Sequence, residues 1–140
     1  MGSNPISPII FLNKEKEKKE MKCFYCKQEF SLTGTQGGQN RQFCFNCIPE
    51  GLERKERDKL RKKLITDLAN QQKIEIKCSK CGYDKCPQAL EWHHPNDDKN
   101  FNLADLIRDG SIKKYELYQK EIEKCILLCS NCHREEHYMK

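Results

Sequence analysis

Apolar residues are scarce in this sequence: they make up 36% of its 140 residues, while 34% are charged. A chain of this length forms one medium-sized domain or two very small ones. With so few apolar side chains the hydrophobic core must be thin, and small domains with thin cores usually depend on disulfides, bound metal ions or oligomerisation. We therefore expect cross-links of some kind to hold this fold together.

Long apolar runs and a secretory signal are also missing. The run PIIFL is far shorter than a membrane span, and NKEKEKKE follows it without a cleavage-site pattern. The sequence thus predicts a cytoplasmic protein with no membrane partner. Because cytosolic thiols stay reduced, we expect the ten cysteines to bind metal ions, with a disulfide framework as the alternative.

The excess of one charge sign is small. The formal net charge is +5. Two zinc sites with four cysteine thiolates each would remove most of it, because every such site is a dianion. Net charge is therefore a weak indication of a nucleic-acid partner, and only local clusters of charge can carry that argument.

Two C-x2-C pairs stand in the first half of the chain. Their members are Cys23, Cys26, Cys44 and Cys47. The intervening SLTGTQGGQNRQ is rich in Gly, Thr and Gln, which predicts a hairpin or loop between two knuckles. This spacing predicts a structural zinc site in which sulfur takes every position, so none is open for catalysis. We assign residues 21–50 to a four-cysteine zinc finger of treble-clef or ribbon type, and residues 1–20 to a disordered tail.

A basic linker helix is expected over residues 51–75. Leu60, Leu64 and Leu68 recur at spacing four in a segment of good helix formers, which gives one apolar stripe. The helix could lie along a phosphate backbone, or it could be a solvated connection; the two interpretations are evenly balanced. The candidate DNA contacts are Arg54, Lys55, Arg57, Lys59, Arg61, Lys62 and Lys63.

A second double pair of cysteines frames the C-terminal half. It consists of Cys78, Cys81, Cys129 and Cys132, with 47 residues between the two pairs. If they share one zinc ion, they tie the beginning of a domain over residues 76–140 to its end. The alternation in KIEIKC predicts a short strand entering the first knuckle. Cys86 and Cys125 are left over, and we expect them to be buried thiols.

The segment between these pairs contains further periodic patterns. Residues 112–124 place apolar side chains at helical spacing, which predicts an amphipathic helix. The apolar run CILL predicts a strand leading to the second knuckle, and HREEHY begins a final helix. The fold class is therefore α+β.

Histidine is scarce in this sequence, and its four copies form two clusters. His133 and His137 are four residues apart, so on a helix both imidazoles can reach one ion. His93 would complete a three-histidine site with positions open for water and substrate. Neighbours on a strand point to opposite faces, so His94 would stay free as a base near neutral pH. Alternatively, His93 and His94 complete a zinc site in place of cysteines.

The segments LEWHHPNDDKNF and CILLCSNCHREEH resemble the HNH endonucleases of the ββα-metal superfamily, above all small phage and bacterial members with a flanking four-cysteine zinc site. The resemblance covers residues 76–140. It implies that His93 and His133 bind the catalytic metal, that His94 is the general base activating water, and that His137 matches the extra helix histidine of DNase colicins.

The resemblance further implies a metal-dependent DNA endonuclease acting on double-stranded DNA in the cytoplasm of a bacterium or a phage-infected host. The expected cofactors are two structural zinc ions and one catalytic Mg²⁺, Mn²⁺, Ni²⁺ or Zn²⁺. One active site nicks one strand, so a double-strand break needs a homodimer or two events. The products would carry 5′-phosphate and 3′-hydroxyl ends. Arg134 could hold a phosphate or pair with a neighbouring glutamate.

The sequence departs from the family pattern at two places. Lys124 stands nine residues before His133, where the middle Asn of the family pins the loop that carries the base; Asn102 is a candidate substitute. The 38 residues between His94 and His133 exceed the compact motif, which indicates a helical insertion over residues 100–124. The alternatives are a non-catalytic nucleic-acid-binding zinc protein on a decayed HNH scaffold, and a zinc-stabilised protein-interaction module.

Overall fold

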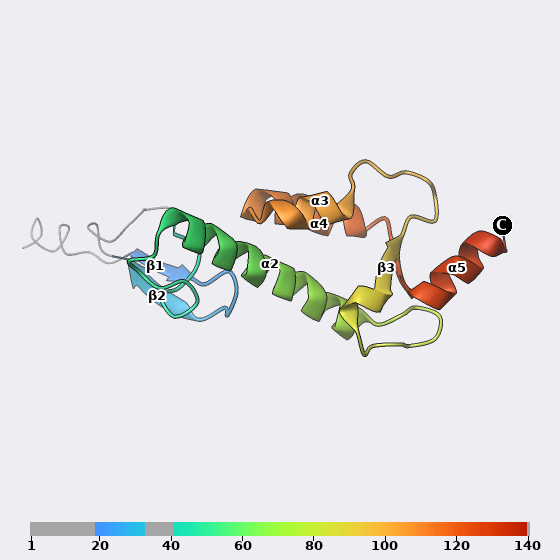
Figure 1. Cartoon of the computed structure of the whole chain (residues 1–140), viewed down its shortest axis with the longest axis horizontal. Coiled ribbons are helices and arrows are strands. Elements are labelled where there is room, and N and C mark those ends of the chain that lie inside the picture. Colours follow the sequence, from blue (N-terminus) through green and yellow to red (C-terminus); the bar gives the residue numbers. More distant parts are fainter. Residues whose placement is uncertain (1–18, 33–40, 140) are drawn as a thin grey trace, which may run out of the picture. The chain divides into compact units, whose positions relative to one another are not determined.

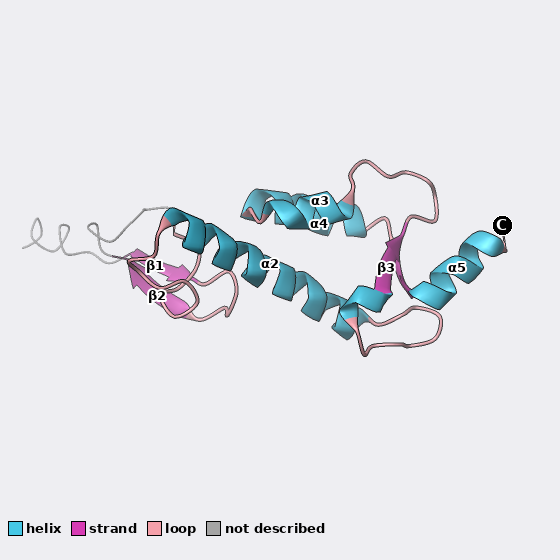
Figure 2. Ribbon diagram, viewed as in Figure 1, coloured by secondary structure: helices cyan, strands magenta, loops and turns pink. Residues whose placement is uncertain are grey.

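The computed structural model describes residues 19–32 and 41–139 (Figures 1 and 2). The chain divides into two compact units, Met1–Glu53 and Arg54–Lys140, which are described separately here. The predicted tail up to residue 18 and much of the Gly-rich insert lie outside the described residues. Lys19 and Glu20, which the sequence placed in the tail, belong to a strand.

The first unit contains an antiparallel hairpin of β1 (Lys19–Lys22) and β2 (Glu29–Leu32). Its turn holds the first C-x2-C pair, and Lys27 in that turn adopts a left-handed backbone with φ of 66°. Among the residues of this unit that the structure describes, the buried ones are Cys23, Leu32, Phe43, Cys44 and Ile48. Two of these five are cysteines, so the core of the unit is small and is built around sulfur.

The second unit is composed of helices around a second two-stranded sheet. Its elements are α2 (Arg54–Ile76), the 3-10 helix η1 (Pro87–Ala89), β3 (Leu90–His93), α3 (Leu103–Asp109), α4 (Ile112–Ile122), β4 (Ile126–Cys129) and α5 (Ser130–Tyr138). β3 and β4 run antiparallel, with Leu90 opposite Cys129 and His93 opposite Ile126. The described chain is thus a small α+β fold with four α-helices and two small antiparallel sheets.

Several local predictions are confirmed. The amphipathic segment is α4, the apolar run is β4, and the final helix is α5, which already starts at Ser130. The helical character of the basic segment is confirmed by α2. The segment between His94 and α4 contains a second helix, α3, which lies beside α4 (Figure 1).

The strand predicted in KIEIKC is wrong, because α2 continues through this segment to Ile76. Ile74 packs against the core of the sheet, whereas Ile76 is 47% exposed, so the alternation does not mark one buried face. Lys77 follows the last residue of the helix; its φ is 68° and its N–H donates to the Lys73 carbonyl at 2.9 Å. A left-handed residue of this kind satisfies a carbonyl that the helix end would leave unpaired.

Two apolar clusters hold the second unit together. One surrounds the sheet and comprises Cys78, Leu90, Leu127, Leu128, Cys129 and Cys132. The other lies among the helices and comprises Ala69, Leu106, Tyr118 and Ile122. Trp92 packs against both clusters and therefore joins β3 to the helices. Within the described residues no helix is long and apolar enough to cross a membrane.

Candidate functional site

The first four cysteines converge in space as their spacing predicts. The sulfur atoms of Cys23, Cys26, Cys44 and Cys47 all lie within 4.8 Å of one another. The Sγ atoms are 3.8 Å apart between Cys23 and Cys47, and 3.7 Å between Cys26 and Cys44. Four thiolates about 2.3 Å from a tetrahedral zinc ion would lie about 3.8 Å from each other. The donor set and its spacing therefore fit zinc.

The second quartet converges in the same way. Cys78, Cys81, Cys129 and Cys132 also place their sulfur atoms within 4.8 Å of one another. Sγ of Cys81 lies 3.6 Å from Sγ of Cys129, although 48 positions separate the two residues. One ion at this point would connect the loop after α2 to the end of β4 and the start of α5.

The thiol pKa values within each quartet diverge. Although burial raises them, hydrogen bonds from backbone N–H groups lower the pKa of Cys23 and of Cys78 to about 6. The pKa of Cys47 is raised by burial and by the neighbouring thiols. That of Cys132 is raised by its hydrogen bond to Cys129 and by burial. Four adjacent thiolates repel each other unless a cation sits among them, and zinc would supply this charge.

The two remaining cysteines stand apart from both quartets. Cys86 is half-buried, and its Sγ donates to Gln88 Oε1 at 3.2 Å. Cys125 is also half-buried and donates to the Glu121 carbonyl oxygen at 3.6 Å, while burial raises its pKa to about 11. The two thiols are therefore less buried than the sequence predicts.

Three of the four histidines form a third group of potential metal ligands. His93 ends β3 and is 3% exposed, whereas His133 and His137 lie one turn apart on α5. Their ring nitrogens lie within 4.8 Å of one another, and the Nε2 atoms of His133 and His137 are 3.0 Å apart. Imidazole nitrogens about 2.0–2.1 Å from a shared ion have this separation. The group can hold a divalent metal, and three protein ligands leave positions open for other ligands.

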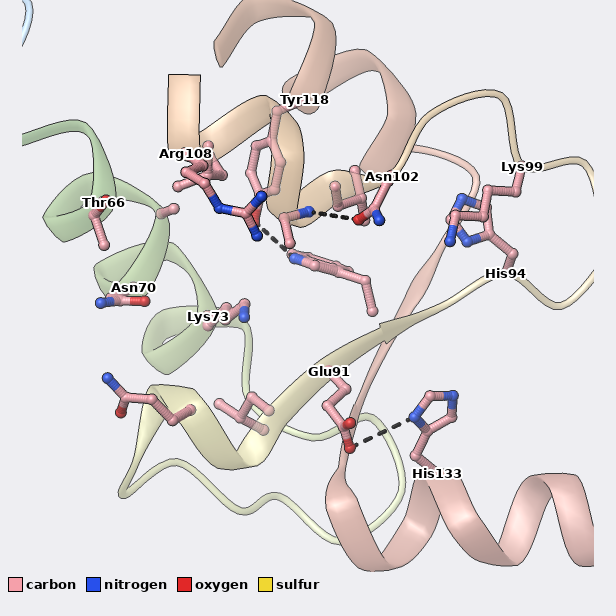
Figure 3. Close-up of a pocket in the computed structure, with 17 residues that line it drawn as sticks. Thr66, Asn70, Lys73, Glu91, His94, Lys99, Asn102, Arg108, Tyr118 and His133 are labelled. Carbon is pink, nitrogen blue, oxygen red and sulfur yellow. Dashed lines mark hydrogen bonds and ion pairs between the residues drawn. The ribbon is translucent and has the colours of Figure 1, made fainter. Parts of the chain in front are cut away.

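Glu91 lies beside one member of the histidine group. Its Oε2 lies 3.6 Å from Nδ1 of His133, and Figure 3 shows the two side chains facing each other. The other ring nitrogen of His133, Nε2, is the atom that faces His137. Carboxylates in this position typically hold a metal-binding histidine in one tautomer and orientation. The sequence analysis did not single out Glu91. Its place two residues before His93, on the same face of the strand, is the signal that could have identified it.

His94 is separate from this group. It follows β3 directly and its side chain is 11% exposed. Its Nε2 lies 2.8 Å from Oε2 of Glu121, on α4. Neither His94 nor His93 joins a cysteine quartet, so the alternative in which the two complete a zinc site with cysteines is wrong.

Glu121 is a second functional candidate that sequence reasoning missed. Its side chain is 2% exposed. Besides facing His94, it accepts hydrogen bonds from the Asn100 N–H at 3.0 Å and from Lys124 Nζ at 3.1 Å. Although burial raises the pKa of this carboxyl, these partners lower it to about 2. The available signal was a carboxylate between Tyr118 and Ile122 on the apolar stripe of α4.

Lys124, at the position of the middle Asn, and Asn102, its candidate substitute, make different contacts. Lys124 binds Glu121 and also donates to the Asp98 carbonyl oxygen at 3.3 Å. Asn102 caps α3, where its Oδ1 accepts a hydrogen bond from the Ala104 N–H at 3.1 Å. Within the described residues, Asn102 makes no contact that would orient His94, so its proposed substitution for the middle Asn is not supported by this geometry.

A cavity of about 670 Å³ lies between α2, β3 and α3, and both His94 and His133 line it. Lys73 on α2, Lys99 and Arg108 also line the cavity (Figure 3). Burial lowers the pKa of Lys73, and the nearby charge of Glu91 opposes this effect in part. A partly desolvated ammonium that faces a cavity is suited to bind an anion.

The predicted DNA-contact residues differ in exposure. Arg61 is half-buried; it pairs with Asp58 at 3.2 Å and donates from Nε to the Gly110 carbonyl at 2.9 Å. Its guanidinium group therefore makes contacts inside the second unit. The other members are exposed: Arg54, Lys55, Arg57, Lys59, Lys62, Lys63 and Arg134.

Comparisons of the chain with protein-family models, with curated proteins and with solved structures found no match.

Proposed function

We propose that this chain is a metal-dependent DNA endonuclease of the HNH type. The observation that carries the proposal is the division among its histidines. Three converge on one point, while His94 is turned to a different partner and lines a cavity with cationic residues. The order β3, β4, α5, with histidines at the end of the first strand and on the helix, agrees with the ββα-metal resemblance.

In this proposal His94 accepts a proton from the water that attacks the scissile phosphate. His93, His133 and His137 would hold the catalytic divalent ion. When bound, that ion supplies electrostatic stabilisation to the transition state and to the leaving 3′ oxygen. Glu91 keeps His133 in its orientation. The strand is cut between phosphorus and the 3′ oxygen, which leaves 5′-phosphate and 3′-hydroxyl ends.

The substrate we propose is double-stranded DNA. Lys73, Lys99 and Arg108 would meet phosphates close to the reacting bond, since they line the same cavity as His94. The exposed basic side chains at the start of α2 and Arg134 on α5 would add contacts that do not depend on sequence. One such site nicks one strand, so a double-strand break requires a homodimer or two successive events.

The two cysteine quartets would bind structural zinc ions and hold the fold that positions these residues. Three imidazoles favour late transition metals and zinc at the catalytic position. Magnesium prefers oxygen ligands. We therefore expect nickel or manganese to support cleavage at least as well as magnesium. The reaction is run under reducing conditions, as in the cytoplasm, so that the cysteines form no disulfides.

The test is incubation of zinc-loaded protein with supercoiled plasmid and a panel of divalent metals. The wild type should convert the plasmid to the nicked form. His94→Ala should lower the rate about 10²- to 10⁴-fold, the usual contribution of a general base. Lys113→Ala, which removes an exposed side chain on α4, is the matched control and should cut normally. A wild type that never nicks, or a His94→Ala variant that nicks equally well, contradicts the proposal.

A second candidate function is a nucleic-acid-binding zinc protein on an HNH scaffold that has lost catalysis. Lys124 at the position of the middle Asn favours it. This candidate predicts that labelled duplex DNA binds to the protein with a strong salt dependence, while no divalent metal produces a nick. A zinc-stabilised protein-interaction module would bind no DNA at all.

A further inference from the structure

We propose that Glu121 is the positioning residue for His94: it holds the imidazole with Nε2 protonated, so that Nδ1 carries the lone pair that takes the proton from water. This inference rests on the proposed function, because it assigns a task within that same site. It also gives Lys124 a role.

The hydrogen-bond roles at Glu121 follow from its chemistry. An ionised carboxylate only accepts hydrogen bonds. Its Oε2 lies 2.8 Å from His94 Nε2 and 3.0 Å from the Asn100 backbone nitrogen. Because a carboxylate cannot donate, the proton in the first of these contacts belongs to Nε2. In a neutral imidazole the other nitrogen, Nδ1, is then the acceptor.

Glu121 also fixes the chain that carries His94. The same oxygen binds the His94 side chain and the Asn100 backbone, and so connects both ends of the loop that leaves β3. The carboxylate itself is fixed, because it lies on α4 between Tyr118 and Ile122, both of which pack in the helical core. The loop therefore has one rigid anchor, and that anchor contacts the proposed base directly.

Lys124 completes the arrangement. Its Nζ donates to Oε1, the carboxylate oxygen that does not face His94, and to the Asp98 carbonyl within the same loop. A buried carboxylate is costly unless it is paired and hydrogen-bonded. The lysine offsets this cost and leaves Oε2 available for the imidazole. Pinning of the base-carrying loop, which the resemblance attributes to an Asn at position 124, is achieved here by Glu121 with Lys124 as its support.

A purely structural role would not require this carboxylate. An apolar side chain of similar volume would fill the position on α4, and replacing buried ion pairs by such residues is often neutral or stabilising. Here all three partners of the carboxylate belong to the loop of His94 or to Lys124, which holds that loop as well. The contacts therefore all involve the loop that carries His94 or the lysine that holds this loop.

The kinetic test uses single-turnover nicking of supercoiled plasmid, with the metal that gives the highest wild-type rate. Glu121→Gln keeps the shape of the side chain but offers His94 an amide. We expect the rate at saturating DNA to fall about 10- to 100-fold, the range found for carboxylates that orient a metal-binding histidine. The DNA concentration for half-maximal rate should stay within about twofold. Glu116→Gln, an exposed change on the same helix, should behave as wild type.

A double-mutant cycle separates positioning from general damage to the fold. If Glu121 acts through His94, then Glu121→Gln should cause no further loss in a His94→Ala background, because coupled residues are not additive. A further loss of 10-fold or more there would overturn the inference, as would a Glu121→Gln single variant with full activity. Unchanged zinc content and thermal unfolding of each variant show that the comparison is between folded proteins.

A second measurement needs no catalysis. Long-range ¹H–¹⁵N spectra of the imidazole rings, recorded on zinc-loaded protein at pH 8, distinguish the two neutral tautomers. His94 should appear as the Nε2–H form in the wild type and in Glu116→Gln, and should lose this preference in Glu121→Gln. An Nδ1–H form in the wild type overturns the inference. A wild type that cuts no DNA but shows the Nε2–H form would instead contradict the proposed function.

Discussion

A hydrogen bond connects Trp92, which packs against both apolar clusters of the second unit, to Tyr118 in the helical cluster. Trp92 Nε1 donates to Tyr118 Oη at 2.7 Å, and Tyr118 is 2% exposed. Tyr118→Phe removes only the oxygen and leaves the half-buried indole N–H without a partner. We expect the free energy of unfolding to fall by about 1–3 kcal/mol, measured by denaturation of zinc-loaded protein. Tyr138→Phe, at a side chain that is 88% exposed, is the control and should change nothing.

The same tyrosine predicts a pH dependence at the alkaline end. Burial raises the pKa of Tyr118 to about 12, with the hydrogen bond from Trp92 opposing this only in part. The folded state thus keeps its proton longer than the unfolded state, whose ordinary value is near 10. The resulting stability is fully present below pH about 10 and is lost as the pH rises towards 12. Between pH 9 and 11 the wild type should lose about 1 kcal/mol more than Tyr118→Phe. Equal losses would contradict the assignment.

At the scale of elements, the contact between α2 and the end of α3 depends on one glycine. Gly110 has φ of 73°, and a Cβ there would overlap Cγ of Lys62 and lie 3.1 Å from its Cα. Gly82 has a similar φ of 76° but open space around it. Both changes to Ala carry the left-handed cost of about 1 kcal/mol. Gly110→Ala should lose about 1–3 kcal/mol more, because it also forces helix α2 away. Equal unfolding free energies would show that the helices adjust freely.

The elements differ in how well the sequence predicts them, and the reason is physical. The stripe in α4 and the apolar run in β4 each bury a face, so their periodicity reports the fold. Residues at the end of α2 alternate as well, but this segment is the last part of a long helix and keeps the helical backbone. Ile76 is exposed, so the alternation does not create a buried strand face. Local alternation over four residues cannot outweigh a long helix.

The candidate site was only partly predictable from the sequence, because metal ligands follow recognisable spacings and the residues that contact the histidines do not. Metal ligands have fixed residue types and spacings, so all three groups could be found from the sequence. Glu91 and Glu121 contact His133 and His94, and no fixed spacing marks such partners. Glu121 is 27 positions from His94, and only the packing of α4 beside the loop brings them together. The residue at position 124 alone therefore did not indicate that Glu121 contacts His94 and the loop after it.

At the scale of the whole molecule, each unit has its own cysteine quartet, so zinc binding and folding should be separable between units. Structural zinc contributes folding free energy directly, because the ligands do not form a site in the unfolded chain. We expect Cys129→Ser to lower the zinc content by one ion per chain and to unfold the second unit. Cys23→Ser should also remove one ion, but it should leave the amide-exchange protection of α4 and β4 intact.

Cys86→Ser is the matched control for both variants, because Cys86 lies outside the quartets. It should keep the zinc content and the unfolding transition of the wild type. Metal analysis under reducing conditions and hydrogen exchange provide the two readouts. If Cys129→Ser kept the wild-type zinc content, the second quartet would not be a metal site. If Cys23→Ser abolished protection in α4, the two units would fold as one, and the zinc of the first unit would be needed to position His94 as well.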